Sequence, residues 1–172
     1  MSRMVRENPT SGLRERLWFA QWTLRQLKLA RTAQRPHGEL LAQRSAVILH
    51  GYTVLVALAR TVSPNAPDGD ISLASLLDGA QQSGASQPTL QLLAAAGNDR
   101  SDPLCWLQQQ AEQLFAAGGL AQRPLAREAD SLALTADDPN RPLADGDLQR
   151  LEQAVARIER LLSDAATQTE EW

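Results

Sequence analysis

The sequence predicts an all-α protein, a mostly antiparallel bundle of about five or six helices. Hydrophobic residues repeat every three or four positions over several stretches of the chain, which is the period of an amphipathic helix. Pro, Gly and Asp gather between these stretches, where helices end, and no two segments alternate as paired strands would. With 172 residues, 43% of them hydrophobic and 22% charged, the chain has ordinary globular composition. We therefore expect one helical domain over residues 1–172.

The first predicted helix begins after Thr10 or Ser11, either of which can cap it, and ends near Gln34. One face of it is apolar, through Leu13, Leu17, Ala20, Leu24 and Leu27, and a second apolar strip consists of Trp18, Trp22 and Leu29. A helix that is apolar on two sides usually lies between two neighbours. We therefore expect both strips to pack inside the bundle.

The same helix also carries the candidate binding surface. Residues 1–35 have a net charge of +6 and the remaining residues have −9. The two regions either pair within the molecule, the interpretation we favour, or the basic one binds an acidic partner. The candidate partner-binding residues are Arg14, Trp18, Trp22 and Arg25. Tryptophans beside arginines form a basic aromatic surface, and such a surface can also stack on nucleic-acid bases. Nucleic acid is compatible with this surface. It is not favoured as the partner, because the net charge of the whole chain is −3.

The second helix, about 38–62, is predicted to be central, because its part from Val47 to Ala59 is apolar nearly all round. On a helical wheel Arg44 falls on the packing face, in one narrow sector with Ile48, Gly51, Leu55, Leu58 and Val62. A buried guanidinium needs a carboxylate or several carbonyl groups. We expect no membrane span, because the apolar run is shorter than the roughly 20 residues required and includes His50 and Thr53.

Three shorter helices and one long helix follow. The segment "ISLASLLD" is expected to stop at Gly79, and "PTLQLLAAA" to stop at Gly97. The next helix has Asp102 as its cap and Pro103 as its first residue. The last begins near Asp145, with a stripe of Leu148, Leu151, Val155, Ile158, Leu162 and Ala165. Before it, residues 118–144 show no helical period and are predicted to form a functional or loosely ordered arm.

Arg44, His50 and Tyr52 together resemble the motif of the HEPN superfamily, small all-α ribonucleases and nucleotidyltransferase partners. The resemblance implies a metal-independent reaction at a dimer cleft. His50 would exchange a proton with the 2′-hydroxyl, and Arg44 would stabilise the phosphate charge. The structural alternative, which we favour, is that His50 is mostly buried, neutral and hydrogen-bonded to a neighbouring helix, while Tyr52 caps a partner helix.

A wider resemblance covers most of the chain. The segments "RERLWFAQ", "LLAQRSAVILHGYTVLVALA" and "LADGDLQRLEQAVARIERLL" resemble an uncharacterised family of small proteobacterial proteins, a domain of unknown function. This resemblance implies a bacterial, single-domain, all-helical protein and supplies no catalytic residues.

Cofactor chemistry is not expected from the composition. Cys105 is the single cysteine, so there is no internal disulfide, and with only His37 and His50 there is no usual zinc site. The segment "MSRMVRENPTSG" has no apolar run behind its arginines, and we expect a cytoplasmic protein. The predicted function is a non-enzymatic interaction module that binds a protein partner, and the alternative is a HEPN-like ribonuclease or an inactive relative. A homodimer is compatible with both. Arg44 and His50 opening onto one cleft would favour the nuclease.

Overall fold

The structure, a computed structural model, describes residues 9–63, 71–82, 87–116 and 146–170, and in these ranges it contains helices and no strand. The all-α prediction is therefore confirmed. The predicted arm at 118–144 lies outside the described residues. The helices, in chain order, are α1 (Pro9–Thr32), α2 (His37–Val62), α3 (Leu73–Gln82), α4 (Pro88–Asn98), α5 (Pro103–Phe115) and α6 (Asp147–Glu170).

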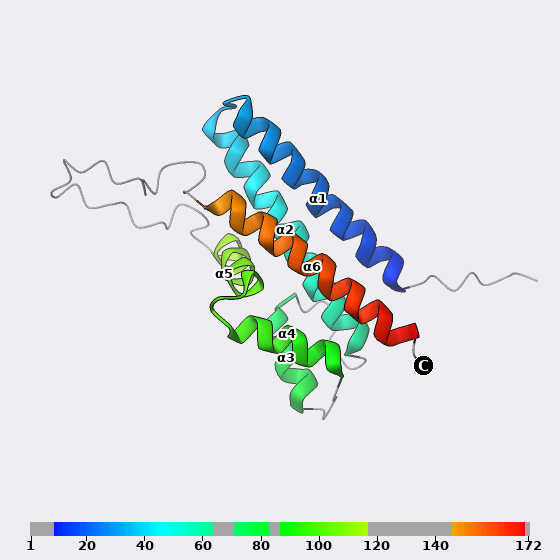
Figure 1. The fold of residues 1–172 in the computed structure, drawn as a ribbon. Helices are drawn as coiled ribbons and strands as arrows, with labels where there is room; N and C mark the ends of the chain where they lie inside the picture. The colour runs from blue at the N-terminus through cyan, green and yellow to red at the C-terminus, as the bar shows by residue number, and fades with distance from the viewer. Residues whose placement is uncertain (1–8, 64–70, 83–86, 117–145, 171–172) are drawn as a thin grey trace, which may run out of the picture.

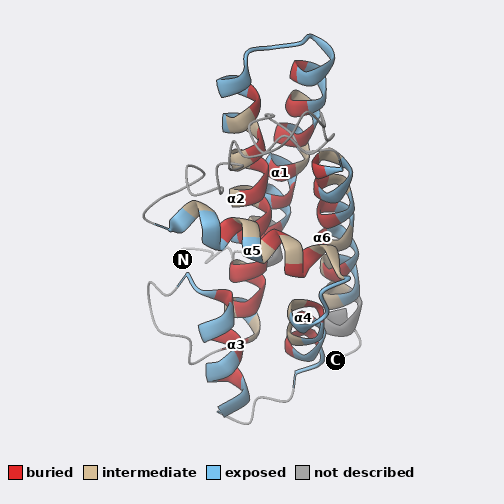
Figure 2. Cartoon of the chain, turned by 90° about the vertical axis from the view of Figure 1, so that its left-hand side faces the viewer, coloured by how far each residue is buried: buried red, intermediate tan, exposed pale blue. Residues whose placement is uncertain are grey.

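Helix α2 is the centre of the bundle, as predicted, because it packs against each of the other five described helices. Figure 1 shows α1 and α2 as an antiparallel pair, with α6 lying beside them and running in the same direction as α2. Helices α3 and α4 lie near the C-terminal end of α2, and α5 crosses its middle (Figure 2). The three long helices thus form the frame on which the three short ones pack.

Close packing around α2 depends on Gly51. A methyl group added there would lie 3.2 Å from Leu107 Cδ2 of α5 and 3.4 Å from Ile158 Cδ1 of α6. By length and composition α2 could also cross a membrane, but half of its most apolar window is buried by the rest of the protein. In this fold it is the core helix, and Figure 2 shows much of its ribbon in the colour of buried residues.

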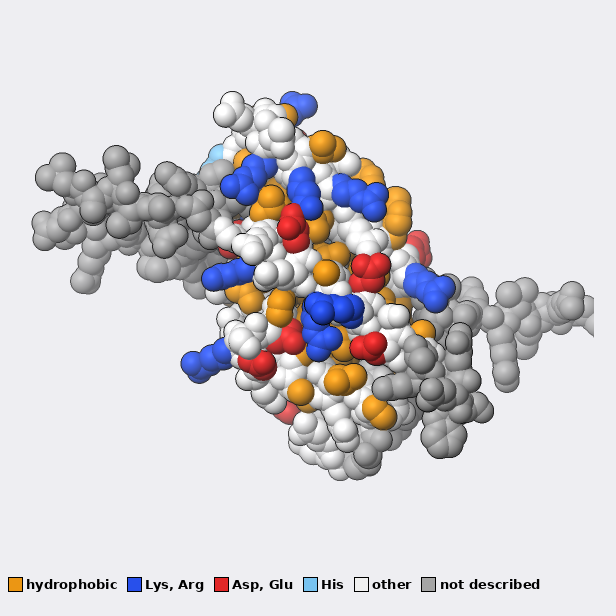
Figure 3. Space-filling model, in the orientation of Figure 1, with side chains coloured by type: hydrophobic (Ala, Val, Ile, Leu, Met, Phe, Trp, Pro, Cys, Tyr) orange, Lys and Arg blue, Asp and Glu red, His pale blue; other side chains and the backbone are white. Residues whose placement is uncertain are grey.

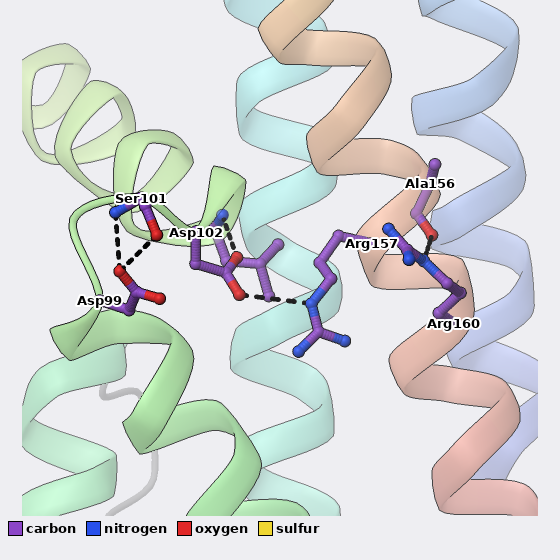
Figure 4. Close-up of polar contacts among 7 residues, drawn as sticks. Asp99, Ser101, Asp102, Ala156, Arg157 and Arg160 are labelled. Carbon is purple, nitrogen blue, oxygen red and sulfur yellow. Dashed lines mark hydrogen bonds and ion pairs between the residues drawn. The ribbon is translucent and has the colours of Figure 1, made fainter.

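Polar contacts hold the start of α5 against α6 (Figure 4). Asp102 caps α5 as predicted, since its Oδ1 accepts a hydrogen bond from Leu104 N at 2.8 Å. Its second oxygen, Oδ2, lies 3.3 Å from Arg157 Nε on α6. Just before this cap, Asp99 Oδ1 accepts hydrogen bonds from the Ser101 hydroxyl at 2.7 Å and from Ser101 N at 2.8 Å. These two bonds, the hydroxyl's first, lower the pKa of Asp99 below its ordinary value of 3.8.

Several helix boundaries differ from the predictions by a few residues. Helix α1 begins at Pro9, before both predicted caps. Helix α3 continues through Gly79 to Gln82, because an isolated glycine costs a helix only about 1 kcal/mol and the next residue, Ala80, is buried in the core. Helix α6 begins at Asp147 rather than near residue 145.

Candidate functional site

Arg44 lies in the core, where it joins three helices. Its side chain is 1% exposed, its Nε donates to Asp147 Oδ2 at 2.8 Å, and its Nη2 donates to Gln110 Oε1 at 2.6 Å. Asp147 is the first residue of α6 and Gln110 belongs to α5. The predicted burial of Arg44 and its need for a carboxylate are therefore confirmed. The sequence did not identify Asp147 as the partner, because 103 positions separate the two residues.

Trp106 of α5 packs beside this ion pair. Its ring centroid lies 6.0 Å from the guanidinium carbon of Arg44 and 5.9 Å from that of Arg150 on α6. Both distances are within the range of a cation–π interaction. The guanidinium of Arg44 thus has a carboxylate, an amide oxygen and an aromatic ring beside it, and each of them stabilises its charge inside the fold.

His50 has a different environment from the predicted one. It is only partly buried, and its imidazole makes no hydrogen bond to any residue in the described ranges. The ring instead stacks on Phe19 of α1, with centroids 5.7 Å apart and planes 29° from parallel. The predicted hydrogen bond to a neighbouring helix is therefore wrong, because the side of α2 that carries His50 faces an aromatic ring at the edge of α1.

Tyr52 caps α3. Its hydroxyl accepts a hydrogen bond from Leu73 N at 3.0 Å and donates one to Ile71 O at 2.9 Å. Leu73 is the first residue of α3, so the tyrosine satisfies one of the backbone N–H groups that a helix start leaves without an intrahelical partner. The expectation that Tyr52 caps a partner helix is confirmed.

Arg44 and His50 do not open onto one surface of the described chain. They are six residues apart on α2, which places their side chains about 120° apart around the helix. Arg44 points to α5 and α6, whereas His50 contacts α1. A proton-transfer group and a phosphate-stabilising group must both reach the same phosphodiester. The arrangement that the nuclease interpretation needs is not assembled within the described part of one chain.

The candidate partner-binding residues, in contrast, lie together on the solvent side of α1. With Leu29 they form what we call the α1 stripe: Arg14, Trp18, Trp22, Arg25 and Leu29, all exposed. They repeat at intervals of four, four, three and four residues and occupy an arc of about 80°. Trp18 is 52% exposed, Trp22 47% and Leu29 63%. The expectation that this strip packs inside the bundle is wrong, because α1 lies at the edge of the bundle and uses its other face to pack on α2 and α6.

The two tryptophans support each other. Their rings stack with centroids 6.4 Å apart and planes 21° from parallel. Phe19 meets the Trp18 ring edge-on at 5.4 Å and also stacks on His50, so a row of ring contacts runs from α1 to α2. Such contacts restrict the rotamers of the exposed rings, which lowers the entropy that a partner must remove on binding.

The basic residues of α1 divide into paired and unpaired ones. Lys28 Nζ lies 2.7 Å from Glu152 Oε1 of α6, so the basic and acidic parts of the chain meet within the molecule at this point. Arg14 and Arg25 are exposed and form no ion pair with any described residue. Figure 3 shows basic and hydrophobic side chains together over α1, along the upper right edge of the molecule. The two arginines are therefore available to an external acidic group.

Two other features of the described residues do not form a comparable site. A depression between α3 and α4, lined by Leu77, Ala80, Leu90 and Ala94 among others, has a volume of about 40 Å³. Sites for small-molecule ligands measure about 300–1,000 Å³, so this depression holds only a few water molecules. No group of three or more His, Cys, Asp or Glu residues in these ranges is placed to hold a metal ion.

No known protein family, curated protein or solved structure matches this chain.

Proposed function

We propose that this protein is a non-enzymatic helical interaction module that binds a protein partner through the α1 stripe. The observation that carries the proposal is the exposed tryptophan stack, Trp18 and Trp22, between two arginines that form no ion pair with a described residue. Tryptophan and arginine are among the residues most enriched in the hot spots of protein–protein interfaces, where a few side chains supply most of the binding energy. The setting that we propose is a bacterial cell, which the resemblance to the proteobacterial family implies.

Burial of the two tryptophans would supply a substantial part of the binding energy. A tryptophan that becomes fully buried removes about 150–250 Å² from water. Trp18 and Trp22 have about half of their surface left to bury, so a partner that covers both would remove roughly 150–250 Å². At about 25 cal/mol per Å² this burial contributes about 4–6 kcal/mol before the costs of association.

Site-directed photocrosslinking tests the proposal. A photoreactive amino acid replaces Leu29 in the α1 stripe, and in a matched control it replaces Leu92, an exposed leucine of α4. In cells of the native organism we expect one adduct of discrete mass from position 29 and none from position 92. Trp18→Ala with Trp22→Ala should abolish that adduct. Equal adducts from both positions, or an adduct that survives the double substitution, would contradict the proposal.

A fold control accompanies this experiment. Because both tryptophans are about half exposed, their replacement removes part of the packing on α1, and an unchanged helical circular dichroism spectrum with a cooperative urea melt should show that the double variant still folds. The alternative function, a HEPN-like ribonuclease, requires Arg44 to leave its buried ion pair with Asp147, and we do not propose it.

A further inference from the structure

We infer that the partner is an acidic amphipathic helix that lies along the α1 stripe and carries two carboxylates about 16 Å apart. This inference rests on the proposed function and names the chemistry of its partner. Arg25 lies eleven positions after Arg14, which at 1.5 Å per residue is about 16 Å along the helix axis. Trp18 and Trp22 lie between them, about 6 and 12 Å from Arg14. Apolar side chains of the partner would therefore sit between its two acidic ones.

Charge complementarity selects an acidic partner. Arg14 and Arg25 point in nearly the same direction, about 20° apart around α1, and neither pairs with a described carboxylate. The nearest acidic side chain in sequence is Glu15, which is exposed but points about 100° away from Arg14, about 20° outside the arc on the far side of the tryptophans. The arc of the α1 stripe thus contains two cations and no anion. Opposite charges across an interface speed association and exclude like-charged partners.

The spacing of the apolar residues selects a helical partner. Trp18, Trp22 and Leu29 are spaced by four and seven residues, which places them on one straight seam along a helix. A second helix with the same intervals can pack its side chains between those of the seam over several turns. An extended strand has a period of two and would match only isolated positions of the seam.

A second copy of this chain fits the stripe poorly. When two copies of α1 pair antiparallel about the tryptophans, Arg14 of one copy meets Arg25 of the other, because both residues lie on the same side of the seam. Like charges that meet across an interface are destabilising. A heterologous acidic helix avoids this repulsion, so we favour it over self-association.

Peptide selection tests the inference. The full-length protein is used to select from a display library of 18-residue helix-forming peptides in which Glu and Lys are equally frequent. We expect enrichment of peptides with two Glu residues eleven positions apart and Leu or Phe between them. Replacing both stripe arginines, as Arg14→Glu with Arg25→Glu, should weaken binding of these peptides at least tenfold. Selection on that variant should enrich Lys at the same two positions. Arg100→Glu, at an exposed arginine between α4 and α5, is the matched control and should leave binding unchanged.

The outcomes separate this inference from the proposed function. Selected peptides that need Trp18 and Trp22 but show no preference for Glu would overturn the acidic-helix inference and leave the proposed function standing. A selection that enriches no peptide, or only peptides that still bind Trp18→Ala with Trp22→Ala, would overturn both. Concentration-dependent dimerisation that the same double substitution abolishes, measured by sedimentation equilibrium, would identify a second copy as the occupant and overturn the inference.

Discussion

Replacing Arg44 with methionine removes a buried cation and leaves the carboxylate of Asp147 without its ion-pair partner. The two side chains are 1% and 7% exposed and meet at 2.8 Å, so water cannot replace the lost contact. Breaking a buried ion pair by removing one partner costs about 3–5 kcal/mol, chiefly because the other charge stays buried. Methionine keeps the unbranched stem of the arginine, so the change in packing volume adds little to this cost. We expect Arg44→Met to lower the free energy of unfolding by about 3–5 kcal/mol.

Two further ion pairs serve as graded controls. Arg157 pairs with Asp102 at 3.3 Å with exposures of 24% and 13%, and Lys28 pairs with Glu152 at 2.7 Å with exposures of 47% and 42%. Exposed ion pairs contribute about 0–1 kcal/mol, because water screens them and both side chains lose rotamer freedom. We therefore expect Arg157→Met to cost about 1–2 kcal/mol, and Lys28→Met to cost less than about 1 kcal/mol.

Urea denaturation followed by circular dichroism at 222 nm measures these changes, and a double-mutant cycle isolates the ion pair. Asp147→Ala should cost a similar amount to Arg44→Met. The variant with both changes should cost less than the sum by about 3 kcal/mol, because no buried charge is then left alone. The reasoning is refuted if the two costs add within about 0.5 kcal/mol, or if Arg44→Met costs no more than Lys28→Met.

Three further predictions concern the other polar groups. His50→Ala should lower the free energy of unfolding by only about 0.5–1.5 kcal/mol in thermal or urea melts, since the ring stacks on Phe19 without a hydrogen bond to a described residue. RNA incubated with either protein should stay intact. RNA cleavage by the parent that the variant lacks would contradict this prediction. Tyr52→Phe should lower the free energy of unfolding by about 1–3 kcal/mol and speed hydrogen exchange at the first turn of α3, because it removes the acceptor of the helix's first N–H group. Unchanged hydrogen exchange there would count against the cap. Ser101→Ala should raise the pKa of Asp99 towards 3.8 in a carbon-13 carboxyl titration. Because the folded pKa is the lowered one, the stabilisation by Asp99 is present above pH 3.8 and is lost as the pH falls through the folded pKa. An unchanged pKa of Asp99 would show that the serine hydroxyl is not the cause.

Helix periodicity and the chemistry of helix ends were sufficient to predict much of the fold. Asp102 followed by Pro103 predicted the start of α5 correctly, because a cap depends only on neighbours in the sequence. The apolar run of α2 predicted its central position, since a helix that is apolar nearly all round is stable only when others cover it. The burial of Arg44 followed from its place on the same wheel sector as Ile48 and Gly51.

The candidate site was predictable only in part. The sequence indicated that Arg14, Trp18, Trp22 and Arg25 share a region of α1, but it predicted that the tryptophans are packed. Their exposure depends on where α2 and α6 lie, and both of them contact the opposite face of α1. A hydrophobic strip has the same period whether a neighbouring helix or a binding partner covers it, so periodicity alone cannot distinguish the two.

The sequence by itself determined which segments are helical, which helix is central, and that Arg44 must find a buried partner, because each of these follows from spacing along a single helix. Only the tertiary structure decided that Asp147 is that partner, that His50 faces Phe19 and that the tryptophans of α1 face solvent. These contacts join residues from different helices. Their formation depends on how the helices are placed around α2, and that placement is determined by the packing of all their buried side chains at once.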